Sequence, residues 1–449
     1  MNINPKNKSS FKLFDLILHG KYVDVSMSLF LVGICILFNI VISHHYFHTA
    51  ITGTDQSTYN GIALALLHGT NLAKVGNFTI DIGQEVTPFY SAFVAFTYYL
   101  HPSIYSLIIL QVILNCASIL LLFASLKILT QNKILSFFIA LVFIFYFPLW
   151  GLNFYVMMEV PTVFLISLII YLLVVFFRTN TIKNLYQAVA VFSFLVLMNN
   201  RFIVLFGVLF LFIAYLTFKK PGITIIQLSI AALISILVIS PWFVRQYNTY
   251  HQFVFFTPLW HNVLAKNNLL VNPIPIVSIE DQYEAKNVKS YEEYSQQLIN
   301  SGYPASKLMT KEKYLLVLNN NNGKIYTERL LRYFTLYERD YNQLYSNSYT
   351  ILPPSSLPFC VIQLVILLPL FLFSLAGAII AFVKKDKFII LLVMFSISHI
   401  CLHILINYID RYRLSILPVL ILLAAFGIYN ILPIFFSNNI YSKNERQNT

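Results

Sequence analysis

Residues 183–220 read KNLYQAVAVFSFLVLMNNRFIVLFGVLFLFIAYLTFKK, and this stretch decides the class of fold. It contains two uncharged apolar runs, 184–200 and 202–218, each long enough to cross about 30 Å of hydrocarbon as a helix. Lysines flank the pair at both outer ends, and Asn-Asn-Arg separates the two runs. The stretch therefore predicts a helical hairpin in a membrane, with its lysines on one side and Arg201 on the other.

The rest of the chain repeats this pattern. Of its 449 residues, 58% are hydrophobic and only 11% are charged, whereas a soluble domain has about a quarter charged residues. Ten crossings are expected, at 26–43, 103–126, 134–158, 160–177, 184–200, 202–218, 221–244, 355–383, 388–409 and 414–442. The sequence thus predicts an all-α polytopic integral membrane protein with about ten transmembrane helices.

The distribution of basic residues predicts the orientation. If the N-terminus is cytosolic, each short cytosolic segment carries two or more Lys or Arg, as the positive-inside rule requires. The net charge of +12 then reflects topology, and we expect no nucleic-acid partner. The run 86–100 would reverse this pattern if it crossed, so we expect a helix in the outer interface. The expected location is a plasma membrane of the bacterial inner-membrane type, with both termini cytosolic.

Four regions follow from this topology. They are a cytosolic tail at 1–25, a membrane module at 26–244 with a first outer loop at 45–102, a large extracytoplasmic loop at 245–354, and a C-terminal three-helix module at 355–449 with a short cytosolic tail. The large loop is expected to be mostly helical, near 290–318 and 324–345, and to cap the bundle.

Asp55 is the first candidate for chemistry. The apolar residues at 59, 62, 63, 66 and 67 share one helical face, which predicts an interfacial helix that opens at Thr54 or Asp55 and ends at Gly69. A carboxylate at this boundary can act as a general base on an acceptor hydroxyl. Asp is also a favoured helix cap, and the two roles are compatible.

Four arginines form a second group: Arg201, Arg245, Arg411 and Arg413. They are predicted at the outer ends of apolar runs, where the positive-inside rule disfavours cations. The planar guanidinium binds phosphate oxygens through two parallel hydrogen bonds. The pattern predicts a lipid-phosphate site, with ordinary interfacial snorkelling as the alternative.

Three carboxylates, Glu159, Asp81 and Glu85, are expected at the outer face, and each fits either an active site or an exposed loop. His399 and His403 lie one helical turn apart on the ninth crossing, and His44, His45 and His48 lie outside the first crossing. Imidazoles at this spacing can share a metal, but no matching carboxylate pattern accompanies them, so core or interfacial histidines are the preferred interpretation. No cofactor is certain, and a divalent metal stays open.

The four cysteines all fall in apolar runs, and no CxxC pair is present. This pattern predicts small buried side chains and supports neither a disulfide framework nor a zinc site.

Four blocks of this sequence resemble a glycosyltransferase of the GT-C superfamily, in the branch of protein O-mannosyltransferases and lipid A aminoarabinose transferases (glycosyltransferase family 39-like). The blocks are TGTDQSTYNGIALALLHG at 52–69, TPFYSAFVAFTYYL at 87–100, SPWFVRQYNTYHQFVFFTP at 240–258 and RYRLSILPVLILLAAFG at 411–427. Their order and spacing match that branch across nearly the whole chain.

The resemblance implies roles for single residues. Asp55 would be the catalytic base, Arg245, Arg411 and Arg413 would belong to the lipid-phosphate pocket, and Glu159 would lie near the site. Tyr59 and Tyr412, inside two of the blocks, are further active-site candidates.

The chain departs from the branch at two points. It has Gln56 where many relatives have a second acid, and Gln-Glu-Val at 84–86 where many have Arg. Both departures bear on metal use and on the donor sugar.

These features predict an enzyme that transfers a sugar from a polyprenyl-phosphate-linked donor to a lipid, glycan or protein acceptor on the extracytoplasmic face. Inversion at the anomeric carbon is expected, with Asp55 as base, and membrane lipids surround the bundle. The main alternative is a transporter or flippase of a lipid-linked or anionic substrate. A non-catalytic assembly or sensor protein is a third class.

Overall fold

The computed structural model describes residues 21–46, 54–69, 88–146, 151–219, 223–250, 357–405 and 410–445, and all regular structure in these ranges is helical. The α-helices are α2 (Lys21–Tyr46), α3 (Thr54–Leu67), α5 (Pro88–Leu100), α6 (Ile104–Thr130), α7 (Lys133–Ile144), α9 (Glu159–Thr179), α10 (Ile182–Met198), α11 (Ile203–Lys219), α12 (Ile225–Tyr250), α19 (Leu357–Lys384), α20 (Lys387–Leu405) and α21 (Leu417–Glu445). Three short 3-10 segments are η2 (Leu152–Phe154), η3 (Asn200–Phe202) and η5 (Asp410–Ile416).

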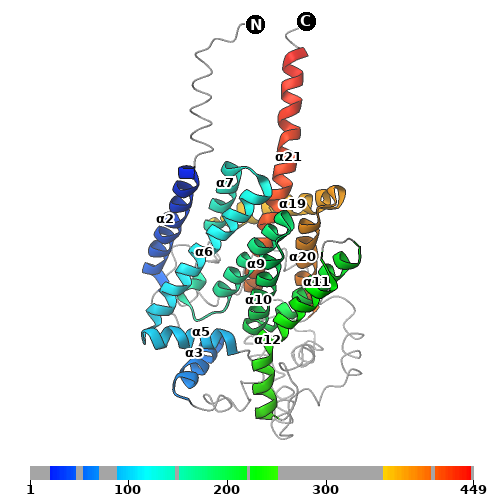
Figure 1. Cartoon of the computed structure of the whole chain (residues 1–449). Coiled ribbons are helices and arrows are strands. Elements are labelled where there is room, and N and C mark those ends of the chain that lie inside the picture. Colours follow the sequence, from blue (N-terminus) through cyan, green and yellow to red (C-terminus); the bar gives the residue numbers. More distant parts are fainter. Residues whose placement is uncertain are drawn as a thin grey trace, which may run out of the picture.

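Seven helices in the described ranges are long and apolar enough to cross a membrane: α2, α6, α9, α11, α12, α19 and α21. The other three expected crossings coincide with the shorter apolar helices α7, α10 and α20. The class of fold, a helical membrane protein, is therefore confirmed, while the number of crossings stays a prediction. Helix α5 has 13 residues, about 20 Å at 1.5 Å per residue, which is too short to span. It lies with α3 across one end of the bundle (Figure 1).

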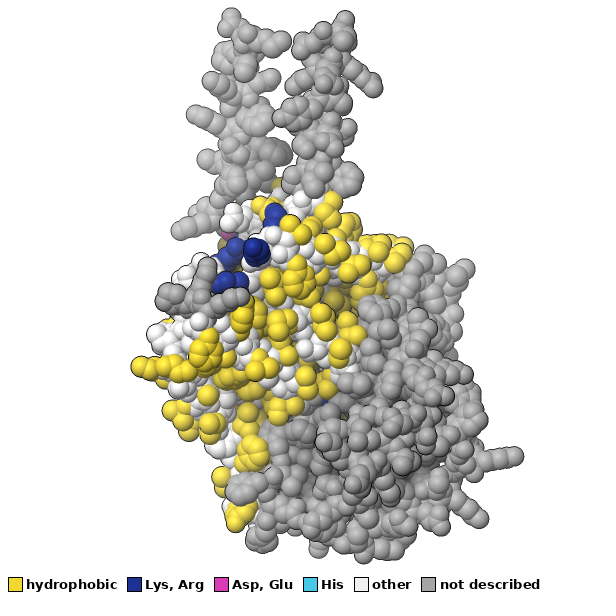
Figure 2. All heavy atoms as spheres, turned by 90° about the vertical axis from the view of Figure 1, so that its right-hand side faces the viewer, with side chains coloured by type: hydrophobic (Ala, Val, Ile, Leu, Met, Phe, Trp, Pro, Cys, Tyr) yellow, Lys and Arg dark blue, Asp and Glu magenta, His cyan; other side chains and the backbone are white. Residues whose placement is uncertain are grey.

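Apolar side chains cover the outside of the bundle. Figure 2 shows them as a broad band below a group of Lys and Arg side chains. Phe218, Val383 and Leu211 are 81%, 78% and 71% exposed. A soluble protein rarely exposes so continuous an apolar surface, so this surface fits lipid.

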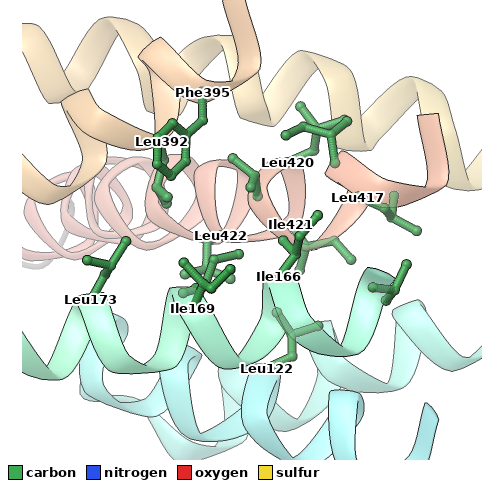
Figure 3. Packing of buried hydrophobic residues seen from close by; sticks show 14 of the residues in the cluster. Leu122, Ile166, Ile169, Leu173, Leu392, Phe395, Leu417, Leu420, Ile421 and Leu422 are labelled. Atoms are coloured by element: carbon green, nitrogen blue, oxygen red, sulfur yellow. The ribbon is translucent and has the colours of Figure 1, made fainter. Parts of the chain in front are cut away.

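Helices α9 and α21 form the centre of the core. Buried side chains make up 67% of the apolar window of α9 and 78% of that of α21, against 17% for each of the outer helices α2 and α12. In Figure 3, Ile166 and Ile169 of α9 face Leu420 and Ile421 of the C-terminal helix. The interior is therefore built from helices that are far apart in sequence.

Helices α19 and α21 approach closely because two glycines face the crossing. A Cβ added to Gly377 would lie 2.0 Å from the backbone oxygen of Leu423, and one added to Gly427 would lie 2.4 Å from that of Phe373. Ser374 Oγ donates to the backbone oxygen of Leu420 at 2.8 Å across the same interface. Small residues of this kind allow close helix packing where no hydrophobic effect drives association.

The expected crossing at 134–158 is wrong in its second half. Helix α7 ends at Ile144, and the chain then passes through η2 before α9 begins at Glu159. Non-helical backbone at this depth needs hydrogen-bond partners inside the protein. Gln111 of α6 supplies them, since its Nε2 donates to the backbone oxygens of Asn153 and Tyr155 at 2.8 and 3.0 Å.

A ladder of three buried asparagines holds the same segment. Asn115 Nδ2 donates to Asn153 Oδ1 at 2.6 Å, and Asn153 Nδ2 donates to Asn39 Oδ1 at 2.6 Å. Asn39 Nδ2 in turn donates to the backbone oxygen of Cys35 at 2.8 Å. The asparagine ladder therefore ties α2 and α6 to the turn that leads into α9.

Ion pairs mark one end of the bundle. Asp24 of α2 contacts Lys127 Nζ at 2.9 Å and Lys133 Nζ at 3.2 Å, and Arg178 at the end of α9 lies 3.6 Å from Asp386. We call this the basic end. Because α9 runs from Glu159 to the basic end, the start of α9 lies at the opposite end. That the basic end faces the cytosol stays a prediction.

Candidate functional site

A small polar cavity lies at the end of the bundle opposite the basic end. It is enclosed where α9 begins, where α10 meets α11 through η3, and where α20 meets η5. Its lining residues are Glu159, Thr162, Asn199, Arg201, Phe202, Leu205, His399, Leu402, His403 and Ser415. The space inside is of the order of one water molecule. Buried charged and polar groups in a membrane bundle mark functional sites by default, because their insertion is costly.

Local structure places the two charged residues. Glu159 is in the first turn of α9 and is 4% exposed, a position where the helix dipole favours a carboxylate. Asn199 follows the end of α10, and its Oδ1 accepts a hydrogen bond from the backbone N–H of Arg201 at 3.2 Å. This tight turn within the apolar hairpin 184–218 brings Arg201 to the cavity wall.

A histidine pair forms the opposite wall. His399 Nε2 and His403 Nε2 lie 3.1 Å apart, and His399 Nε2 also lies 3.1 Å from Ser415 Oγ. A hydrogen bond between two imidazole nitrogens requires one donor and one acceptor. The imidazole of His403 and the hydroxyl of Ser415 therefore share one nitrogen of His399 as their hydrogen-bond partner. Both rings are almost fully buried.

The cavity thus combines a cation with hydrogen-bonding groups. A guanidinium such as that of Arg201 can bind an anion such as phosphate, and Glu159 adds a carboxylate to the same lining. The imidazoles and the hydroxyl of Ser415 can exchange protons with a ligand. In the described part of the chain, no group of three or more His, Cys, Asp or Glu is arranged to hold a metal ion. Among these residues, a divalent metal at the cavity would have the histidine pair without a third ligand of these types.

Helix α3 lies against the entrance to α9. Tyr59 Oη donates to Met158 Sδ at 3.5 Å, directly before Glu159, and the rings of Tyr59 and Tyr90 are 5.0 Å apart. Asp55 occupies the first turn of α3, one helical turn before Tyr59. Gln56, which follows Asp55 in the first turn of α3, is fully buried. The segment 54–67 is therefore an element of the site region.

The expected apolar face of α3 is partly confirmed. Ile62 and Ala63 are buried, with 3% and 0% exposure, and Tyr59 packs against α5. Leu66 and Leu67, in the last turn of α3, are 38% and 37% exposed, so the expected face is not buried over its whole length. The expected helix end is confirmed, since α3 ends at Leu67 and Gly69 takes a left-handed φ of +64°.

The other predicted site residues fall into two groups. Arg413 is buried within η5, and Arg245 of α12 lies over the Trp242 ring at 5.1 Å and donates to Gln246, but neither lines the cavity. The following lie outside the described residues or side chains: Asp55 (side chain), Arg411, Tyr412, Asp81, Glu85, the histidines at 44–48, and the expected helices at 290–318 and 324–345.

Sequence reasoning missed Thr162, Asn199 and Ser415 as cavity residues. One signal was available for Asn199, because Asn-Asn-Arg interrupts an otherwise apolar hairpin. Ser415 and Thr162 carry no such signal, since single hydroxyl residues are common in membrane helices. The histidine pair was visible as a spacing, but its contact with η5 was not.

No protein-family model matches this chain, and no curated protein sequence matches it. Its structure is similar to the crystal structure of the Archaeoglobus fulgidus oligosaccharyltransferase in the apo form, with a TM-score of 0.51 at 12% sequence identity. The similarity covers 96% of this chain and 52% of the oligosaccharyltransferase chain. The two proteins share a fold. This chain spans about half the length of that neighbour.

Proposed function

We propose that this protein is a membrane glycosyltransferase of the GT-C type, which transfers a sugar from a polyprenyl-phosphate-linked donor to a lipid, glycan or protein acceptor on the extracytoplasmic face. The observation that carries the proposal is the buried cavity at the helix ends, where Arg201, Glu159 and the histidine pair converge. A fold shared with an oligosaccharyltransferase supports it.

The lipid phosphate that leaves in this reaction accounts for a buried arginine at the site. When the bond between the anomeric carbon and the phosphate oxygen breaks, negative charge develops on the lipid phosphate. A fixed guanidinium in a water-poor cavity stabilises that charge more strongly than bulk water does. Arg201 takes this role in the proposal, and Arg413 in η5 adds positive charge nearby. Arg411 and Arg245 remain proposed members of the phosphate pocket.

Asp55 is the proposed base. It removes the proton of the acceptor hydroxyl as that oxygen attacks the anomeric carbon from the face opposite the phosphate, so the configuration inverts. Two observations support this role: Asp55 lies in the first turn of α3, and Tyr59 one turn later contacts the residue that precedes Glu159. The loop at 245–354 would cover the site and contribute to acceptor selection.

The test compares four single variants in cells that otherwise lack the protein, with envelope lipids and glycans analysed by mass spectrometry. Asp55→Asn keeps a residue suited to a helix start but removes the base, and product formation should fall by about 10²–10⁴-fold. Arg201→Gln should also abolish product. The matched controls at the basic end, Asp24→Asn and Arg178→Gln, should retain it.

Two outcomes would contradict the proposal. Wild-type product levels in folded Asp55→Asn protein would show that Asp55 is not the base. Equal loss of product in Arg178→Gln and Arg201→Gln would show that the cavity has no special role in transfer. A transporter or flippase would instead change the membrane side on which a lipid-linked sugar lies, without a new glycosidic bond. Accessibility of the labelled lipid to an added lectin separates that result from transfer.

A further inference from the structure

Two cysteines from different helices meet inside the bundle. Cys35 of α2 and Cys116 of α6 place their Sγ atoms 2.9 Å apart, although 81 positions separate them in the chain. Both side chains are buried and neither is part of a disulfide. A disulfide has an S–S length of about 2.05 Å, so the two atoms need to approach by less than ~1 Å to bond. The pair lies outside the polar cavity.

One cysteine of the pair, Cys35, lies on the weakly packed helix α2. Only 17% of the apolar window of α2 is buried, and in lipid no hydrophobic effect holds an outer helix to its neighbours. Polar contacts therefore matter for its attachment: the ion pairs of Asp24 near its start and the asparagine ladder at Asn39. Cys35 stands one turn before Asn39, and Cys116 directly follows Asn115. The cysteine pair thus sits beside the ladder, between two attachment points.

The pair is close to the lipid-facing surface. Ile36, next to Cys35, is 44% exposed, and Ile113, one turn before Cys116, is 55% exposed. The thiols are buried, and on both helices a residue within one turn of the cysteine belongs to the surface that fits lipid. An oxidant dissolved in the bilayer can therefore reach them after a small movement of α2.

We propose that Cys35 and Cys116 are a redox modification site, in which a lipid-soluble quinone converts the two thiols to a disulfide that joins α2 to α6. The two thiols lose two protons and two electrons, the quinone gains both and becomes a hydroquinone, and one S–S bond forms. The cross-link fixes the outer helix beside the asparagine ladder. Thiol reductants reverse it. The site is independent of the reaction proposed above.

The test uses the full-length protein in lipid nanodiscs, with Cys360 and Cys401 replaced by Ser so that only the pair remains. The protein is exposed to decyl-ubiquinone or to copper phenanthroline in air, denatured in SDS and treated with a maleimide-linked polyethylene glycol, which adds one mass step per free thiol. Before oxidation the monomer should gain two polyethylene glycol mass steps, and after oxidation the protein should still run as a monomer but gain none. Dithiothreitol should restore both additions, and the oxidised protein should unfold at a higher temperature.

A near-isosteric swap supplies the control. Ser118 is buried two positions from Cys116 on α6, and 200° of helix rotation directs it to another side. The double variant C116S/S118C keeps the same number of thiols and should retain two additions under the same oxidants. The proposal is overturned if the protein that keeps Cys35 and Cys116 still gains two polyethylene glycol mass steps after oxidation. So would oxidation only to disulfide-linked dimers, or equal loss of thiols in the swap.

Discussion

The crossing of α19 and α21 allows a quantitative prediction for Gly377→Ala. The added Cβ would lie 2.0 Å from the backbone oxygen of Leu423, and real Cβ atoms essentially never come within 3.0 Å of another heavy atom. The helices must therefore separate by at least 3.0 − 2.0 = 1.0 Å along that line. A gap of about 1 Å forfeits a quarter to a half of the dispersion energy of each contact that it opens. The obstacle is backbone, so no side-chain rotation relieves it.

We expect Gly377→Ala to lower the free energy of unfolding by about 3 kcal/mol, the upper end of the range for overpacked cores. The bond from Ser374 to Leu420 should be lost with it, because it spans the same interface. Thermal unfolding in detergent, followed by tryptophan fluorescence and by thiol exposure, measures the effect.

Gly207→Ala is the matched control. Gly207 is inside α11 and has no heavy atom within 4 Å of an added Cβ, so its substitution should stabilise the protein by up to about 1 kcal/mol through helix propensity. The reasoning is refuted if Gly377→Ala unfolds at the wild-type temperature. It is equally refuted if the two variants are destabilised to the same extent.

Three further predictions concern single polar groups. Asn153→Leu removes the side-chain hydrogen bonds from residue 153 to Asn115 and Asn39, so the free energy of unfolding should fall by about 1–3 kcal/mol. An unchanged urea or thermal midpoint would contradict a stabilising role of the asparagine ladder. Asp24→Asn should cost less than about 1 kcal/mol, since its ion pairs are partly exposed, and the difference from wild type should shrink in 0.5 M salt. Ser415→Ala removes the hydroxyl that contacts His399 and should reduce sugar transfer, whereas Ser396→Ala, whose hydroxyl bonds to the backbone of its own helix, should leave transfer unchanged.

Much of the fold follows from the sequence because hydrocarbon imposes a simple rule. Every backbone group in lipid must be satisfied within the protein, so an uncharged run such as 202–218 has to become helix, and α11 at Ile203–Lys219 confirms it. The rule fails at 134–158 because it applies only to backbone that faces lipid. Gln111 and the asparagine ladder satisfy the turn at η2 from inside the bundle, which hydropathy alone does not reveal.

The site is less predictable because it is made by contacts between distant helices. Glu159 and Arg201 were identifiable, since a charged residue beside an apolar run is rare. The sequence could not pair His399 with Ser415, nor Cys35 with Cys116, because both contacts depend on which helices become neighbours. Nor could the sequence show that the guanidinium of Arg245 lies over the Trp242 ring, and its part in a phosphate site stays a prediction.

The central position of α21 has a consequence for biosynthesis. Its most buried part, Arg413–Leu432, packs against α9, which is inserted into the membrane much earlier. Until α21 has been inserted, lipid or another helix must cover the part of α9 that α21 contacts, although α6 and α10 already pack against the rest of α9. We therefore expect the polar cavity to be completed only after η5 and α21 have been inserted, since Ser415 is one of its lining residues. A nascent chain arrested before residue 413 would be inserted but would lack a closed core.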